Sequence, residues 1–255
     1  MDNNAKILVV IPIFRESISQ LLSYLEKQTL KPAYIVIVAA TRAAYERLSH
    51  VSLGIGKVIY VKPVMQEHIG VRVGKAINTA LRQVCLEHYD FLLKLDADVL
   101  LPSNYLARCV TLGADLVGLG PFMLVKIKPF LTLLHGQWPE TPADDAFIAT
   151  KFRAAGLKVE RWLPGITIKT GGSFRQWRYY YLRGMDDFKL GFDPFQELVI
   201  VQHLIRSRHS LLPMFTLLGY VYAFLWKREM YDFGALYFKK KMMESLGKLL
   251  SIKFW

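Results

Sequence analysis

The stretch Tyr89–Leu106, YDFLLKLDADVLLPSNYL, places two acids directly after a strongly apolar run. A run such as Phe91–Leu93 is typical of a parallel strand that is buried on both faces. Ionised carboxylates at the end of such a strand are costly in apolar surroundings. We therefore expect Asp96 and Asp98 to lie where the strand ends in an open cleft that receives a cation.

The sequence before this stretch alternates between strand-like and helix-like segments. Continuous apolar runs predict three further strands, and apolar residues at helical spacing predict three helices. The strands are expected over residues 6–14, 34–40 and 56–62, and the helices over 17–28, 40–50 and 72–89. This alternation predicts an α/β fold with a Rossmann-like, mostly parallel twisted sheet and helices on both faces. Ligands of such folds bind beyond the carboxyl ends of the strands.

The pattern changes after about residue 115. Residues 113–131 predict further strand and loop, with Pro121 and Pro129 as breaks. A helix is expected over residues 141–156, capped by Thr141, with Pro142 at its first position and two acids in its first turn.

The C-terminal part, from Asp193 onward, has a different composition. Residues 210–226 are uncharged, and they contain Pro213 and Gly219. The length of this segment is near the lower limit for a membrane span. We expect this segment to lie in or dip into one leaflet, or to pack under the core. The tail after it is amphipathic at helical spacing and basic, which suits an anionic membrane surface. We therefore divide the chain into an α/β domain, 1–192, and a helical appendage, 193–255.

The whole chain is basic, with a formal net charge of +12, which indicates anionic partners such as nucleotides or lipid phosphates. Its two cysteines, Cys85 and Cys109, form neither a disulfide framework nor a metal motif, so we expect two core thiols in a reducing compartment. The N-terminus lacks the features of a signal peptide. The expected location is cytoplasmic, peripheral on the inner face of the cell membrane.

Five segments resemble, in order, motifs of the inverting family 2 glycosyltransferases of GT-A fold, a group that includes the polyprenyl-phosphate sugar synthases. The resemblance covers roughly residues 5–185. The segments are VVIPIFRE (9–16), HIGVRVGKAINTAL (68–81), LKLDADVLLP (93–102), PADDAFIATKFRAAGLKV (142–159) and SFRQWRYYYLRG (173–184). The resemblance implies a GT-A fold and transfer of a sugar from a nucleotide-sugar donor, with Mg²⁺ or Mn²⁺ as cofactor.

The resemblance also assigns roles to individual residues. LDAD looks like the family's DxD motif, so Asp98 is expected to ligate the metal and Asp96 to serve the ribose and the metal shell. In the acidic pair, Asp145 is expected to be the base that deprotonates the acceptor, and Asp144 to position the acceptor. Further contacts are expected with the donor from Pro12, Phe14, Glu16, Lys75 and Ala97, and with the acceptor or its phosphate from Trp177 and Arg178.

Plain structural readings of these residues remain open. The acids of 144–145 also suit helix capping, and Lys75 with Arg72 also suits a solvated helix face. Arginine forks bind phosphates well, so Arg175, Arg178 and Arg183 favour a diphosphate or lipid phosphate, but their aromatic neighbours also suit a surface helix.

Three departures separate the chain from the family pattern. The second strand ends in Ala39 and Ala40, where many relatives carry an acid that contacts the base. The stretch ITIKTGGS has Lys169 and Thr170 where relatives often have a metal-binding histidine, and His135 is a poor substitute. The motif of processive relatives is absent, so single transfer is expected.

The expected partners are thus a nucleotide-sugar donor, a lipid-linked or glycan acceptor and an anionic membrane surface. Two other functions remain as alternatives. A nucleotidyltransferase normally has a glycine-rich phosphate loop after the first strand, and PIFRES lacks the glycines. A non-catalytic nucleotide- or nucleic-acid-binding protein would fit the charge, but no nucleic-acid motif is present, and we expect no nucleic-acid partner.

Overall fold

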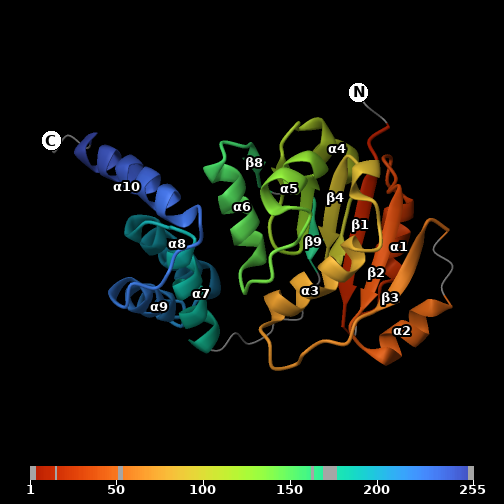
Figure 1. Cartoon of the computed structure of the whole chain (residues 1–255), viewed down its shortest axis with the longest axis horizontal. Helices are drawn as coiled ribbons and strands as arrows, with labels where there is room; N and C mark the ends of the chain where they lie inside the picture. The colour runs from red at the N-terminus through yellow and green to blue at the C-terminus, as the bar shows by residue number, and fades with distance from the viewer. Residues whose placement is uncertain (1–3, 15, 51–53, 162–163, 169–176, 252–255) are drawn as a thin grey trace. The chain divides into compact units, whose positions relative to one another are not determined.

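The computed structural model describes residues 4–14, 16–50, 54–161, 164–168 and 177–251. The chain forms two compact units, residues 1–171 and 172–255. The first is an α/β unit and the second is helical (Figure 1). The sequence-based boundary at residue 192 falls later, inside the helical unit.

The first unit is built on a mixed sheet in the order β3-β2-β1-β4-β7-β6-β8. Strand β1 pairs in parallel with β2 and β4, β2 with β3, and β6 with β8, while β7 runs antiparallel to β4 and β6. A second, two-stranded sheet pairs β5 with β9. The strands span Ile7–Ile13 (β1), Tyr34–Ala39 (β2), Gly56–Tyr60 (β3), Phe91–Leu95 (β4), Val99–Leu100 (β5), Leu116–Val117 (β6), Phe122–Lys126 (β7), Val159–Glu160 (β8) and Thr167–Ile168 (β9).

Helices cover both faces of the large sheet, as expected for an α/β fold. Helices α1, α2 and α4 contribute to one buried core, and α3, α5 and α6 to the other. These helices span Ser19–Glu26 (α1), Arg42–Ser49 (α2), Ile69–Leu81 (α3), Tyr105–Thr111 (α4), Ile127–Leu134 (α5) and Asp144–Ala154 (α6), with a 3-10 turn, η1, at Leu86–His88. Side chains of successive β1 residues alternate between the two cores, so apolar residues occupy the whole strand.

Several local predictions for this unit were wrong, two of them at α5 and α3. Pro129 does not interrupt the chain but lies in the first turn of α5, where backbone N–H groups have no partner within the helix and a proline is tolerated. Helix α3 begins before residue 72, because the imidazole of His68 accepts a hydrogen bond from the Gly70 N–H and caps it. Burial and the charge of Arg72 lower the pKa of His68, which favours the neutral, accepting form.

The two cysteines also differ from expectation. Both are free thiols, but only Cys109 is buried, whereas Cys85 is exposed beside η1 and its thiol donates to Glu87 at 3.2 Å.

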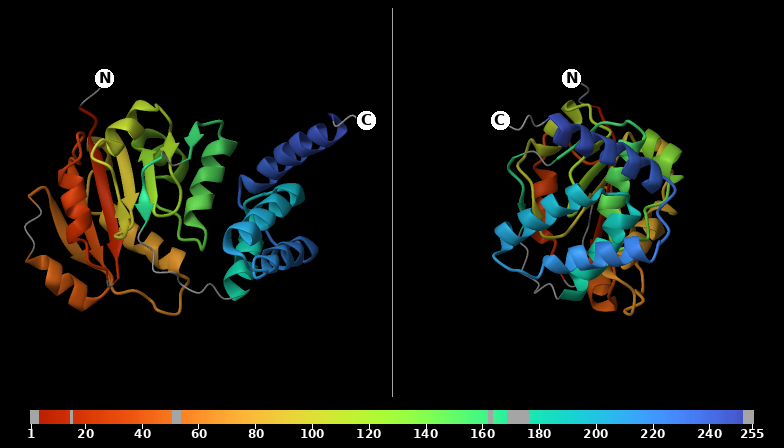
Figure 2. Two further views of the ribbon diagram at one scale, coloured as in Figure 1. Left: turned by 180° about the vertical axis from the view of Figure 1, so that it is seen from behind. Right: turned by 90° about the vertical axis from the view of Figure 1, so that its left-hand side faces the viewer.

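In the described residues, the second unit consists of α7 (Trp177–Lys189), α8 (Pro194–Arg208), α9 (Met214–Leu225) and α10 (Gly234–Ser251). Figure 2 shows these helices, cyan to blue, as rods joined by short connections. Helix α8 starts at Pro194, and the carboxylate of Asp193 accepts from two N–H groups of its first turn. Helix α9 buries Thr216, Gly219, Tyr220 and Ala223 on one face.

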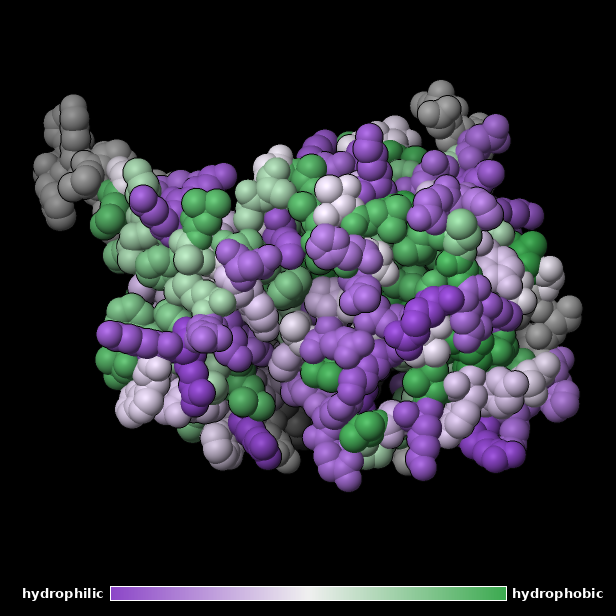
Figure 3. Space-filling model, viewed as in Figure 1, coloured by the Kyte–Doolittle hydropathy of each residue, from purple (hydrophilic) through white to green (hydrophobic). Residues whose placement is uncertain are grey.

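The opposite face of α9 is apolar and exposed. Leu218, Val221 and Leu225 follow each other at helical spacing, with exposed fractions of 57%, 49% and 62%. Figure 3 shows apolar residues interspersed with hydrophilic ones on the face of the helical unit that it displays. No helix in the described part of the chain combines the length and the apolar character that crossing a bilayer requires.

Candidate active site

A cavity of about 570 Å³ lies at the carboxyl ends of β1, β2 and β3, between these strand ends and α3. Parallel strands of an α/β unit end together at this edge, which is where such folds bind ligands. All seven residues that the sequence predicted to contact a donor line this cavity: Pro12, Phe14, Glu16, Lys75, Asp96, Ala97 and Asp98. Figure 3 shows hydrophilic side chains gathered over α3, which forms one wall.

The two acids of the DxD-like motif follow directly after β4. The Asp96 N–H donates to the carbonyl of Pro121 at 2.8 Å, which ties the strand end to the turn before β7. Burial raises the pKa of Asp96, while the ammonium of Lys94 opposes that rise. Asp98 is half-buried on the wall of the same cavity. Both carboxylates thus lie at the strand end, as the opening stretch predicted.

A lysine that sequence reasoning missed lies beside these acids. Lys94 is buried, yet its Nζ contacts Asp96 Oδ1 at 2.7 Å and donates to the carbonyl oxygen of Gly120 at 2.6 Å. Burial opposes its charge, but the carboxylates of Asp96, Asp144 and Asp145 raise its pKa overall. The sequence signal was a single charged residue within the apolar run FLLKL.

The acidic pair opens α6. Asp144 accepts a hydrogen bond from the indole Nε1–H of the buried Trp138 at 2.7 Å. Burial raises the pKa of Asp144 to about 6, against the opposing charge of Lys94. Asp145 accepts from the Ala146 N–H at 2.8 Å and lies beside Gly120, where an added Cβ would be 3.6 Å from Asp145 Oδ2. The two carboxylates therefore have different surroundings.

The predicted cap of this helix was wrong in detail. The helix begins at Asp144 with Ala143 as its N-cap, and no side chain caps it. Thr141 lies further back, and its hydroxyl oxygen is buried without a hydrogen-bond partner in the described residues. Thr141 is displaced because the segment before α6 packs tightly against α3.

Two glycines and an asparagine on α3 hold that segment in place. A Cβ on Gly70 would lie 2.6 Å from the carbonyl oxygen of Pro142, and one on Gly74 would lie 2.5 Å from that of Pro139. One turn further on, the amide of Asn78 bonds both backbone groups of Trp138, at 2.7 Å and 2.9 Å. Only residues without a Cβ allow the approach at the two glycines. The spacing of four places all three on one helical face, and so fixes the entry to α6.

The other residues around the cavity are also positioned by specific contacts. The Phe14 N–H donates to Glu16 Oε2 at 2.6 Å, and Arg47 donates to the Glu16 carbonyl at 2.8 Å. Lys75 is paired with Glu67, which lies in the loop before α3. Lys75 therefore faces the cavity as part of an ion pair, and a bound diphosphate would compete with Glu67 for its ammonium.

The residues predicted to bind the acceptor lie in different units. Asp144 belongs to the α/β unit, whereas Trp177 and Arg178 begin α7 of the helical unit, where both are exposed. The Trp177 ring stacks at a tilt on Phe215, 5.6 Å away. Arg183 is paired within the helical unit with Asp187, at 3.4 Å. Arg175, Lys169 and Thr170 lie outside the described residues.

Two carboxylates of the cavity could contribute ligands to a hard divalent cation. Asp96 and Asp98 offer carboxylate oxygens on the cavity wall, which suits Mg²⁺ or Mn²⁺ bound with phosphate and water oxygens. Within the described ranges, no cluster of three or more His, Cys, Asp or Glu residues is arranged to hold a metal. His135 is the left-handed C-cap of α5, and it does not line the cavity.

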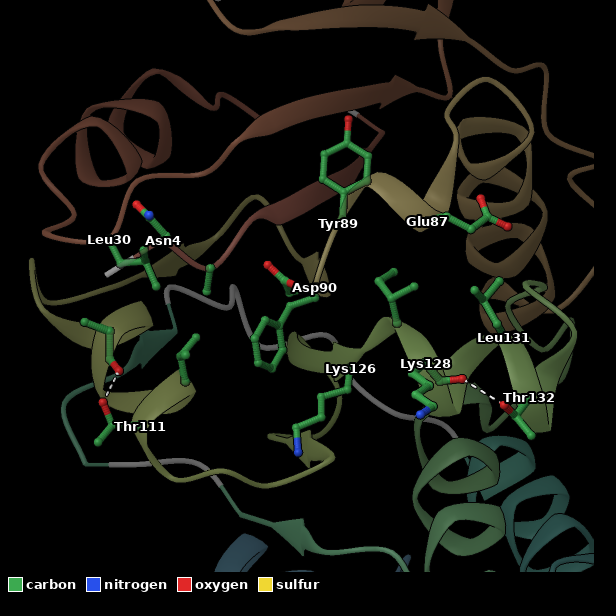
Figure 4. Close-up of a pocket in the computed structure, with 15 residues that line it drawn as sticks. Asn4, Leu30, Glu87, Tyr89, Asp90, Thr111, Lys126, Lys128, Leu131 and Thr132 are labelled. Carbon is green, nitrogen blue, oxygen red and sulfur yellow. Dashed lines mark hydrogen bonds between the residues drawn. The ribbon is translucent and has the colours of Figure 1, made fainter. Parts of the chain in front are cut away.

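A second and larger cavity, about 1050 Å³, lies at the opposite edge of the sheet. Figure 4 shows Tyr89, Asp90 and Lys126 around it, with Thr111 and Thr132 bonded to carbonyls of their own helices. Lys126 is paired with Asp115, and Asp90 accepts from the Lys6 N–H. Several of its polar side chains are thus engaged within the protein, and the acids of the first cavity make that one the candidate site.

No known family model and no curated protein sequence matches the chain. Among solved structures, it is similar to a mannosyltransferase from Pyrobaculum calidifontis, determined in complex with GDP-Man and Mn²⁺. The identity is 16%, the TM-score is 0.55, and the match covers 99% of this chain and 90% of that one. The chain has the GT-A glycosyltransferase fold. The fold that the motifs implied is therefore confirmed.

A glucosyl-3-phosphoglycerate synthase from Mycobacterium tuberculosis, determined with Mn²⁺, UDP and phosphoglyceric acid, is also similar. Its identity is 12% and its TM-score 0.48, over 66% of this chain and 72% of that one. The fold assignment rests on the mannosyltransferase, because of these two matches only that one has a TM-score above 0.5.

Proposed function

We propose that the protein is a metal-dependent, inverting glycosyltransferase that makes single transfers from a nucleotide-sugar to a hydroxyl or phosphate acceptor. The observation that carries this proposal is the cavity at the strand ends, which gathers all seven predicted donor residues in a GT-A fold. The GDP-Man and the Mn²⁺ bound by the similar mannosyltransferase support the same chemistry.

The roles that we propose for the acids in this reaction are those that the resemblance to the family assigns. Asp98 and Asp96 would hold a Mg²⁺ or Mn²⁺ ion, which offsets the charge of the nucleoside diphosphate leaving group. Asp145 would accept the proton of an acceptor hydroxyl during in-line attack at the anomeric carbon, which inverts its configuration. Asp144 is fixed by Trp138, so it suits a positioning role. An ionised phosphate acceptor would need no base.

The first test is thermal stabilisation by UDP, GDP, ADP, CDP and TDP, each with Mn²⁺, Mg²⁺ or EDTA. A ligand at 100 times its Kd stabilises the folded state by about 2.7 kcal/mol. We expect one or two nucleotides to raise the Tm only with metal, and Asp98→Ala to abolish that shift. Stabilisation by none of them would refute a nucleotide-sugar site.

The base is tested separately. Asp145→Asn should keep metal-dependent nucleotide binding and lower the transfer rate by about 10²- to 10⁴-fold, the usual contribution of a positioned base. Transfer by this variant at the wild-type rate to a hydroxyl acceptor would rule out Asp145 as the base.

We also infer that the acceptor is lipid-linked and that the protein binds the inner face of the cell membrane. This is supported by the exposed apolar face of α9 and by the basic residues that follow it, Lys227 and Arg228. Sedimentation with vesicles of phosphatidylserine and phosphatidylcholine tests it. The double variant Leu218→Glu/Val221→Glu should lose most binding, whereas Ile55→Glu, an exposed apolar residue of the other unit, should retain it. Wild-type protein that stays in the supernatant would contradict the inference.

A further inference from the structure

Lys94 is placed where a lysine is costly. It lies within β4 between Leu93 and Leu95, and its side chain is only 7% exposed. Its two neighbours pack in the core formed with α1 and α4, so Lys94 points to the other side, where α3, α5 and α6 lie. A buried ion pair of this kind adds little stability compared with a well-packed apolar residue. Stability alone therefore does not explain a lysine here.

The ammonium of Lys94 connects three parts of the site. It forms an ion pair with one oxygen of Asp96, at 2.7 Å, and donates a hydrogen bond to the carbonyl of Gly120, at 2.6 Å. The charges of Asp144 and Asp145, at the start of α6, also raise its pKa. Gly120, which has a φ of 68°, in turn lies against the carboxylate of Asp145. The donor-side acid and the expected base are thus linked through Lys94 and one turn.

We propose that Lys94 is a positioning residue of the transfer site, which holds one oxygen of Asp96 and the Gly120 turn and so fixes Asp96 relative to Asp145. This inference rests on the proposed function. Lys94 leaves the second oxygen of Asp96 for the donor or the metal shell. It also reduces the negative charge of the acid cluster by one, so that a divalent cation binds weakly there in the absence of the donor.

The test compares Lys94→Met with Lys126→Met. Lys126 makes the same pair of contacts, to an aspartate carboxylate at 3.0 Å and to a glycine carbonyl at 3.0 Å, but with Asp115 and Gly113, outside the donor cavity. The first readout is the affinity for Mn²⁺ alone, measured by electron paramagnetic resonance titration. Removing one positive charge beside Asp96 should tighten Mn²⁺ binding about tenfold in Lys94→Met, and Lys126→Met should leave it unchanged.

The second readout is kinetic, with the nucleotide-sugar whose diphosphate stabilises the wild type. Lys94→Met should lower kcat at least about 100-fold, because misplacing a reacting group by about 1 Å has this effect, and should change KM little. Equal Mn²⁺ affinity in Lys94→Met and wild type, or a kcat like that of Lys126→Met, would overturn the proposal.

Two further measurements keep the proposal decidable. If Lys94→Met does not fold, Lys94→Arg replaces it, because arginine keeps the charge but not the contact geometry. This variant should bind Mn²⁺ like the wild type and still have a lower kcat. A wild-type kcat would overturn the proposal. If the wild type transfers no sugar from any nucleotide donor, the proposed function fails, and the Mn²⁺ comparison alone then decides whether Lys94 controls the acid cluster.

Discussion

The crossing of α7 and α9 should make the helical unit unusually sensitive to one methyl group. A Cβ on Gly184 would lie 1.8 Å from the carbonyl oxygen of Thr216, and a Cβ on Gly219 would lie 1.9 Å from that of Tyr181. The two helices therefore touch backbone to backbone at two glycines. Observed Cβ contacts do not fall below 3.0 Å, so Gly184→Ala would force the helices apart by about 1.2 Å.

The size of the effect follows from the contacts that are lost when the two helices separate. The aromatic cluster beside the crossing, Phe188 on Tyr220 with centroids 5.6 Å apart, would lose contact along with the buried Ala223. Overpacking lowers the free energy of unfolding by about 1–3 kcal/mol, and a clash between two backbone segments lies at the upper end of this range. We expect a loss of about 3 kcal/mol, which lowers the Tm of a unit of this size by roughly 12–24 °C.

The assay is differential scanning calorimetry or urea unfolding followed by far-UV circular dichroism. The matched control is Gly247→Ala in α10, where a new Cβ meets nothing within 4 Å. That change should stabilise the helix by about 0.5–1 kcal/mol, because alanine is the better helix former. The same chemical change is thus expected to act with opposite signs. A Gly184→Ala protein as stable as the wild type would refute the close crossing.

Three further predictions concern single polar groups. Asn78→Ala should lower the free energy of unfolding by about 2–4 kcal/mol, because it leaves the backbone of Trp138 buried without its partners. Urea unfolding measures this loss, and a loss below about 1 kcal/mol would contradict the contact. Burial and then the charge of Asp187 raise the pKa of Glu197, so the folded state binds its proton more tightly and stability falls as pH rises above about 4.5. Glu197→Gln should therefore match the wild type at pH 4 and exceed it in urea unfolding at pH 8; equal stabilities at pH 8 would refute the assignment. The effect of Asp144 on stability has the same sign but covers a narrower pH range, because its pKa rises only to about 6. In Asp144→Asn, the free energy of unfolding should therefore fall less between pH 4 and pH 6, and above pH 7 it should change with pH as in the wild type.

Much of the α/β unit could be predicted from the sequence because its strands are buried on both faces. Such strands read as continuous apolar runs, and β1, β2, β3 and β4 all lie within or close to the segments expected from them. The placement of Asp96 and Asp98 followed from the same pattern, since a carboxylate after such a run must lie at the strand end. The residues predicted to contact a donor line one cavity for the same reason.

The remaining features depend on contacts between distant segments. Lys94 in isolation is a charge inside a strand, and the role that we propose for it needs the Gly120 turn and α6 to be brought beside it. The displacement of Thr141 follows from the packing of α3 on residues 138–142. Helix α9 could be recognised as apolar, but the sequence could not show which of its faces is buried, because the buried face is selected by glycines on two different helices.

Helix α3 divides two tasks between its faces. Gly70, Gly74 and Asn78 hold the chain that leads to the acidic pair, while Arg72 and Val73 on another face form a wall of the cavity. Substitutions on the cavity wall would then alter which ligand fits in the cavity without moving the acids of α6. Under the proposed function, the fold separates the choice of donor from the placement of the base, so donor preference can diverge, by evolution or by engineering, while the reaction geometry is inherited unchanged.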